Sequence, residues 1–150
     1  MSIVAGIEEG RNAYSNIRKV VYFLLSCGLS EVLFFTLSIL FDFPTPLLAI
    51  QLLWLNIVTD GLQDMALSFE REEKEIMSEK PRNPKEAVLD KTMLQEILIS
   101  GLFMGLLIFG VWVYLIDVQK VDVNLGRAYI MMMMVFMQNI HVKNITDDKS

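Results

Sequence analysis

The sequence contains few of the groups that soluble enzymes use for catalysis. Cysteine occurs once, at position 27, which excludes an intrachain disulfide framework and any cysteine-based metal motif. The sequence also has no glycine-rich phosphate loop, no nucleophile placed beside a base, and no basic patch for nucleic acid. We therefore expect no catalytic residue in this chain and no nucleic-acid partner.

Charge is also missing from several long stretches. Hydrophobic residues make up 53% of the sequence and charged residues 21%, and the mean hydropathy is +0.44. The charged residues gather in four blocks: the N-terminal segment, residues 70–91, residues 117–127 and the C-terminal tail. The apolar stretches between these blocks are long enough to cross a bilayer, a pattern typical of a multi-spanning integral membrane protein.

This pattern predicts an all-α fold, a helical membrane bundle with four transmembrane helices. Residues 1–19 should form a cytosolic stalk helix, residues 20–145 the transmembrane region, and residues 146–150 a tail. We expect spans at about 20–41, 47–69, 97–116 and 128–145, a cytosolic loop at 70–91, and a polar loop at 117–127. Asp90 or Thr92 is expected to cap the third span's helix. Gly101 and Gly105, four residues apart, should let another helix approach closely.

The lysines and arginines predict how the chain is oriented. Three lie in the N-terminal segment and six in residues 70–91, whereas the short turn at residues 42–46 has none. Because cytoplasmic flanks of membrane spans are rich in lysine and arginine, both termini and the charged loop are expected to be cytosolic.

The second span is unusual because it carries polar side chains at membrane depth. Asn56, Thr59 and Asp60 are three or four residues apart, so they should project from one side of a helix. Polar groups inside a membrane are costly and commonly mark an ion or proton path. Gln63 and Asp64 extend the polar stripe by another turn, where Asp64 joins a cation path or, as we favour, faces cytosolic water.

Glu31 lies about halfway along the first span and should meet this polar stripe. The turn at 42–46 is so short that the first two spans must be antiparallel neighbours. At about 1.5 Å per residue, Glu31 and residues 56–60 then fall at similar depth. Calcium takes roughly six to eight oxygen ligands, so these side chains would form part of a cation site. Gly61 either loosens the helix beside them or is a close-packing point.

The residues of the second span also resemble a known family. Residues 51–62, QLLWLNIVTDGL, resemble the sixth transmembrane helix of P-type cation-transporting ATPases of the calcium-pump type. Ser30-Glu31-Val32 resembles the cation-binding turn of the fifth helix of these pumps, and Gln138, His141 and Asn144 resemble their eighth. The resemblance covers residues 3–144, equivalent to helices five to eight.

The resemblance implies a set of ligands for the transported cation: Glu31, Asn56, Thr59 and Asp60. Asn56 and Asp60 match the site kept by one-calcium pumps, while Glu31 and Thr59 match the other site. Gly28 stands where two-calcium pumps have an asparagine ligand, and Gln138 stands where they have a glutamate. These departures indicate that the second site is altered or absent, and they leave sodium, potassium, protons or manganese open as alternatives to calcium.

The resemblance further implies a function and partners. The chain would be the membrane cation-binding part of an ATP-driven pump, with Ca²⁺ as the expected cargo. It would be a fragment, with ATP and Mg²⁺ bound by domains outside it, and its partners would be the bilayer and the pump's other helices and cytosolic domains. Asp90-Lys91-Thr92 resembles the start of the phosphorylation motif of these pumps, but Met93 follows it, which favours a helix start.

A second hypothesis is a standalone, non-enzymatic four-helix membrane protein, or a degenerate pump relic, that binds a partner. A reading frame immediately upstream that encodes an Asp-Lys-Thr-Gly-Thr domain would favour the pump. His141 is expected to be an interfacial group or to be satisfied by a neighbouring group, rather than to relay protons.

Overall fold

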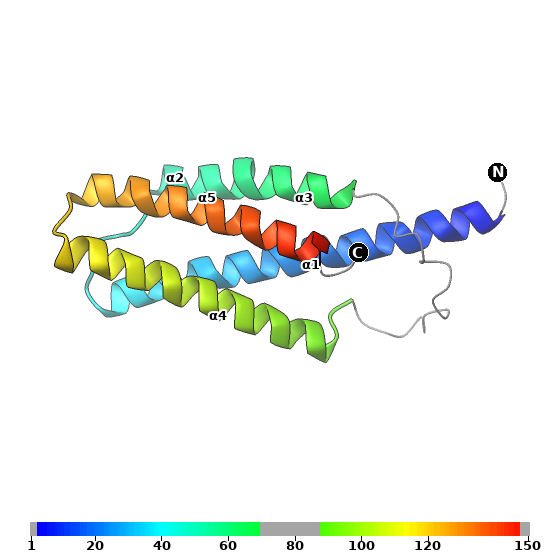
Figure 1. Cartoon of the computed structure of the whole chain (residues 1–150), viewed down its shortest axis with the longest axis horizontal. Helices are drawn as coiled ribbons and strands as arrows, with labels where there is room; N and C mark the ends of the chain where they lie inside the picture. Colours follow the sequence, from blue (N-terminus) through cyan, green and yellow to red (C-terminus); the bar gives the residue numbers. More distant parts are fainter. Residues whose placement is uncertain (1–2, 70–87, 148–150) are drawn as a thin grey trace.

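A computed structural model describes residues 3–69 and 88–147, and within these ranges the chain forms helices and no strands (Figure 1). The elements in order are α1 (Ile3–Leu40), α2 (Ala49–Trp54), the π-helix η1 (Leu55–Asp60), α3 (Gly61–Ser68), α4 (Lys91–Val113), the π-helix η2 (Tyr114–Val118) and α5 (Val123–Asp147). Because α2, η1 and α3 follow one another without a gap, as do α4 and η2, the chain forms four continuous helical rods. The predicted all-α fold is confirmed for the described residues.

Two of these rods pass a test of length and apolarity for membrane spans. They are Ile3–Leu40 and Lys91–Val118. The count of four crossings and the cytosolic stalk at residues 1–19 stay predictions. The stalk and the first predicted span form one uninterrupted helix, α1, since no proline or other breaker separates them.

The second rod and the start of the third rod lie where the sequence predicts helix, although the third rod (91–118) is longer than the predicted span at 97–116. The second rod covers 49–68, within the predicted 47–69. Asp90 is the N-cap of α4, because its carboxylate Oδ1 accepts a hydrogen bond of 2.7 Å from the backbone N–H of Met93. Of the predicted loop at 70–91, residues 70–87 lie outside the described residues.

The prediction of a polar loop at 117–127 is wrong in length, because the loop is shorter than predicted. Helix continues to Val118 and resumes at Val123, so the turn is only residues 119–122. Asp122 explains the early restart: its carboxylate accepts a hydrogen bond from the backbone N–H of Asn124 at 3.0 Å, and its carbonyl accepts one from Gly126 at 2.8 Å. The local capping chemistry therefore favours helix although the residues are polar.

Helix α1 lies at the centre of the bundle and packs most closely against α4. A Cβ atom added at Gly101 would come within 2.7 Å of Leu29 Cδ2, and one at Gly105 within 2.9 Å of Leu33 Cδ2. The prediction that these two glycines allow close approach of a helix is confirmed. The distances leave no room for a larger residue without movement.

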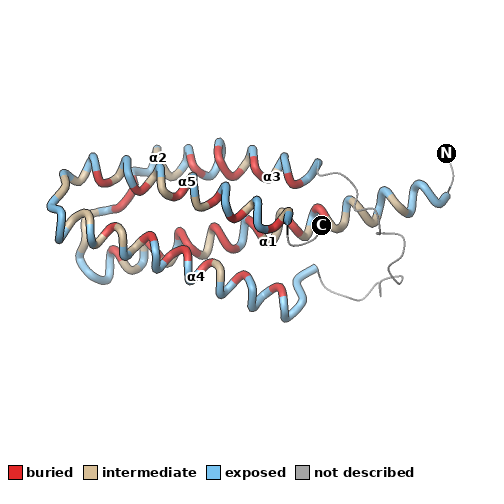
Figure 2. Tube along the Cα trace, viewed as in Figure 1, coloured by how far each residue is buried: buried red, intermediate tan, exposed pale blue. Residues whose placement is uncertain are grey.

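The bundle is apolar on much of its outer surface and has polar groups inside. Large exposed apolar side chains lie on every rod, for example Ile39, Ile57, Phe103 and Phe136. A buried apolar cluster of Phe34, Leu47, Leu55, Ile108, Trp112, Ile130 and Met134 fills one part of the interior. Buried positions recur along the inward faces of all four rods (Figure 2). An apolar exterior of this extent fits a lipid environment better than water.

Candidate functional site

The second rod departs from regular α-helix where its polar residues lie. Residues Leu55–Asp60 form a π-helix, and regular α-helix resumes at Gly61 with ordinary dihedral angles. Single-turn π-helices are found frequently at functional sites. A Cβ at Gly61 would meet no atom within 4 Å, so close packing does not explain this glycine. The helix is loosened in the turn before Gly61.

Glu31 and Asn56 meet across α1 and η1. The side-chain amide of Asn56 donates to Glu31 Oε2 at 3.4 Å and to the backbone carbonyl of Leu52 at 2.9 Å. The 3.4 Å contact is long for a hydrogen bond. It nonetheless places the two side chains at one depth, as the short turn between the first two spans predicts.

Thr59 and Asp60 point into the bundle, whereas Asn56 lies at its edge. Thr59 is 7% exposed and Asp60 4%, and Glu31 is 7% exposed. Asn56 is exposed among the described residues. The single polar face predicted for Asn56, Thr59 and Asp60 is therefore split, with Asn56 between Glu31 and the outer surface.

Several buried side-chain oxygens of α1, η1, α3 and α5 have no hydrogen-bond partner among the described residues. They are Glu31 Oε1, Asp60 Oδ1, Gln63 Oε1, Asp64 Oδ1 and Gln138 Oε1. Asp60 also lies within electrostatic range of Glu31 and Asp64. Buried polar atoms are nearly always hydrogen-bonded, and carboxylate and amide oxygens are the ligands that hard cations take. The cluster therefore has the chemistry of an incomplete cation site.

The acidic groups alone do not complete a metal site. In residues 3–69 and 88–147, no three His, Cys, Asp or Glu side chains come together so that they could hold a metal ion. A cation here would need neutral oxygens as well, such as Thr59, Asn56 or backbone carbonyls. Gly28 adds no side-chain ligand. Gln138 on α5 is buried, and its side-chain oxygen has no hydrogen-bond partner among the described residues.

Polar contacts also link α1 and α3 to α5, and the sequence predicts neither pair of partners. His141 Nε2 lies 2.7 Å from Ser26 Oγ, and its ring lies 5.5 Å from that of Tyr22. The expectation that His141 is satisfied by a neighbour is confirmed. Gln63 donates to Asn139 Oδ1 at 3.0 Å, which ties α3 to α5. No local sequence signal points to either partner.

Apolar outer surfaces around buried acids and amides define this chain as a helical membrane protein with a polar interior. Its family follows from direct comparison. The family described as "Cation transporting ATPase, C-terminus" matches residues 44–150. The chain belongs to the P-type cation-transporting ATPases and corresponds to their C-terminal membrane region.

Three relatives show how far the similarity extends. A calcium-transporting ATPase of Bacillus subtilis is 35% identical over 151 residues, which cover 99% of this chain and 17% of the relative. Calcium-transporting ATPase 1 of Bacillus cereus is 42% identical over 106 residues, 71% of this chain and 12% of the relative. A cation-transporting ATPase of Synechocystis is 34% identical over 145 residues, which cover 97% of this chain and 16% of the relative. The chain thus spans less than a fifth of the length of these relatives.

Proposed function

We propose that this chain is the membrane cation-binding part of an ATP-driven P-type pump and that the transported cation is Ca²⁺. The observation that carries the proposal is the burial of Glu31 and Asp60 with unpartnered carboxylate oxygens beside a π-helix. The names of two relatives, both calcium-transporting ATPases, support calcium as the cargo.

In this proposal, four side chains supply oxygens to the cation: Glu31, Asn56, Thr59 and Asp60. The π-helix η1 carries three of these four side chains, and single-turn π-helices are frequent at functional sites. The remaining ligands come from pump helices outside this chain. ATP and Mg²⁺ are bound by other domains of the pump, and we assign no catalytic residue here.

The proposed arrangement has four crossings, with both termini and the loop at 70–91 in the cytosol. The N-terminal half of α1 then forms a stalk that carries movement of the cytosolic domains into the membrane. Asn16 on this stalk donates to the backbone carbonyl of Ser68 at 3.1 Å, at the end of α3. Displacement of the stalk is therefore passed to the rod that contains Asp60.

A chimera tests this function. The aligned segment of the Bacillus subtilis relative is replaced by this chain, because the similarity between them covers 99% of this chain. We expect the chimera to form a phosphorylated intermediate from ATP in a calcium-dependent manner. Asp60→Asn removes the charge of a ligand without changing its size, and it should abolish the calcium dependence.

Asp117→Asn is the matched control, because Asp117 is an exposed acid of η2 and Asp60 belongs to a different rod. This variant should behave like the parent chimera. Calcium-dependent phosphorylation that is the same in Asp60→Asn and in the parent would reject the role of Asp60. Phosphorylation that does not respond to calcium would reject calcium as the cargo.

A further inference from the structure

Asp64 is an acid of α3 that the proposed set of four ligands does not include. It lies four residues after Asp60, about 6 Å further along the rod at 1.5 Å per residue, toward the end of α3 at Ser68. The proposed membrane arrangement puts this end of α3 beside the cytosol. Asp64 is half-buried, and its Oδ1 is buried with no hydrogen-bond partner among the described residues. Contact with water alone therefore does not explain this carboxylate.

No local structural role explains the Asp64 carboxylate either. Acids in the first turn of a helix are stabilised by the free N–H groups there, but α3 continues directly from η1 and has no free start. Ser68 donates a hydrogen bond of 2.7 Å to the backbone carbonyl of Asp64, not to its carboxylate. A buried oxygen without a partner costs free energy, so a positively charged ligand that visits this position would relieve that cost.

Asp64 shares the space between α1 and the second rod with two of the proposed ligands. The Cys27 thiol of α1 lies within electrostatic range of Asp60, Glu31 and Asp64. Among the residues that the structure describes, however, these acids do not come close enough together to hold one metal ion. The position of Asp64 therefore suits a cation on its way to Asp60 better than a cation already bound there.

Gln63, next to Asp64, adds another unpartnered oxygen to the same stretch of α3. Its side chain is only 8% exposed. Its amide nitrogen donates to Asn139 Oδ1 on α5 at 3.0 Å, which holds the group in place, while its Oε1 has no hydrogen-bond partner in the described part of the chain. Amide and carboxylate oxygens both replace hydration water around hard cations. Suitable oxygens therefore continue along α3 from Asp60 to Asp64.

Apolar side chains fill the axis of the bundle on the cytosolic side of these oxygens. Phe23 of α1, Leu67 of α3 and Ile145 of α5 belong to one buried apolar cluster. Leu67 lies three residues beyond Asp64, toward the end of the rod. Moving an ion through packed apolar side chains is very costly. Access to Asp60 therefore runs along the flank of the second rod, where the half-buried Asp64 lies.

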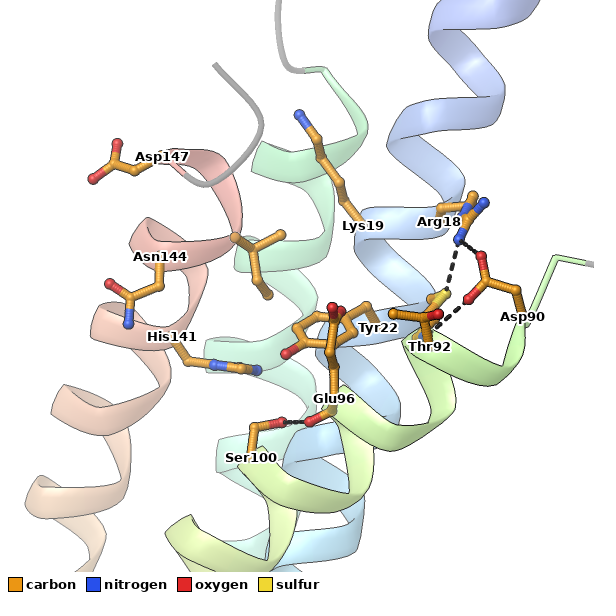
Figure 3. A pocket seen from close by; sticks show the side chains of 12 residues that line it. Arg18, Lys19, Tyr22, Asp90, Thr92, Glu96, Ser100, His141, Asn144 and Asp147 are labelled. Atoms are coloured by element: carbon orange, nitrogen blue, oxygen red, sulfur yellow. Dashed lines mark hydrogen bonds and ion pairs between the residues drawn. The ribbon is translucent and has the colours of Figure 1, made fainter.

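A cavity of about 730 Å³ at the same end of the bundle is the alternative entrance (Figure 3). It opens between α1, α4 and α5, and Glu96 of α4 contributes an acid to its wall. None of the described residues that line it belongs to η1 or α3, and Glu31 is also absent from its wall. The cavity therefore does not reach the buried acids of the proposed site.

We propose that Asp64 is the entrance acid of the cation path, which takes the cation from the cytosolic side and passes it along α3 to Asp60. This inference deepens the proposed function and rests on it. A negative charge at the mouth of a confined passage attracts cations, and such steering raises association rates by roughly 10- to 1,000-fold. Because Asp64 holds the cation only in passage, its loss should slow entry and exit alike and leave the equilibrium affinity nearly unchanged.

The test measures how fast the chimera binds and releases calcium on its cytosolic side. Rapid filtration with radioactive calcium, in the absence of ATP, gives both rates for the parent and for Asp64→Asn. We expect Asp64→Asn to bind as much calcium at saturation as the parent, with association and dissociation each slowed by about tenfold. Asp64→Glu keeps the charge and should restore the parent rates. Asp64→Ser provides a second uncharged variant if Asp64→Asn does not fold.

Glu96→Gln is the control for the alternative entrance, because Glu96 is an exposed acid in the wall of the cavity. It should bind and release calcium at the parent rates. Parent rates in Asp64→Asn would overturn the inference, and slow rates in Glu96→Gln would assign the entrance to the cavity instead. Loss of calcium at equilibrium in Asp64→Asn would make Asp64 a ligand and would also overturn it. A parent chimera that binds no calcium would reject the proposed function itself.

Discussion

Ser26 and His141 form a buried polar pair that links the first and last rods. Ser26 Oγ also bonds the carbonyls of Tyr22 and Phe23 in its own helix, at 2.6 and 3.1 Å. The contact with His141 brings together residues 115 positions apart. The sequence predicts that His141 is satisfied, but the partner depends on how α1 and α5 pack, which no local pattern determines.

Replacing this serine should destabilise the bundle. Ser26→Ala leaves His141 Nε2 buried without its partner, at a cost of about 1–3 kcal/mol. The free energy of unfolding in mixed micelles measures the change. Ser38→Ala is the control, because Ser38 is equally buried and bonds only the carbonyl of Phe34 in its own helix among the described contacts. Equal losses in the two variants would contradict a specific role for the pair.

The four proposed ligands show which features of the cation site can be predicted from the sequence. The chemistry of Glu31 and Asp60 follows from acids in apolar runs, and the short turn predicts that Glu31 meets residue 56. The exposure of Asn56 is not predictable, because a regular helix would place it with Thr59 and Asp60. The π-helix changes the angular spacing of these residues, and no propensity rule identifies it.

Among the elements, the close-packing surface of α4 is predicted from the sequence, but the sequence does not predict that α1 is the helix that packs on it. The four-residue spacing of Gly101 and Gly105 gives α4 a flat strip, and α1 lies against it. Added atoms at Gly105 would also approach the backbone carbonyl of Ser30 at 3.0 Å, one residue before Glu31. Packing of α4 therefore helps to position the helical turn that carries Glu31.

A larger side chain at this contact should separate the two helices. Gly105→Val forces atoms against Leu33 and the backbone of Ser30, with an expected loss of about 1–3 kcal/mol in the free energy of unfolding. Gly110→Val is the matched control in the same helix, since a Cβ at Gly110 meets no atom within 4 Å. If both variants lose the same stability, helix propensity rather than packing explains the effect.

Helix ends are predicted well where a cap is visible in the sequence and poorly where polar residues suggest a loop. Asp90 marks the start of α4 because its side chain has a clear capping position. At residues 117–127 the charges suggest a long loop, yet helix covers all but residues 119–122. Charge patterns indicate solvent exposure rather than backbone conformation, so they overestimate the length of the loop.

For the whole molecule, the block pattern of charge predicts an all-α membrane bundle, and the comparisons confirm the family. Four crossings are expected although only two rods pass the test of length and apolarity. Buried polar residues such as Gln63 and Gln138 lower the apolarity of the other two rods. Polar side chains that face the bundle interior therefore make a membrane-spanning helix harder to recognise from its hydropathy.

Labelling of single cysteines tests the topology. Cys27 is the only cysteine, so Cys27→Ser provides a background without thiols. Cysteines introduced as Glu9→Cys and Lys143→Cys should react with an impermeant thiol reagent from the cytosolic side. Thr45→Cys and Lys120→Cys should react only from the opposite side. Reaction of all four positions from one side would refute the four-crossing arrangement.

The buried acids of α1 and η1 are proposed to bind the transported cation. Equilibrium binding of radioactive calcium to the chimera, compared with its Glu31→Gln and Asp60→Asn variants, measures this binding. We predict that the parent retains bound calcium, that Asp60→Asn loses it, and that Glu31→Gln holds less or binds it more weakly. The same amount of calcium bound with the same affinity in all three proteins would show that Glu31 and Asp60 do not bind the cation.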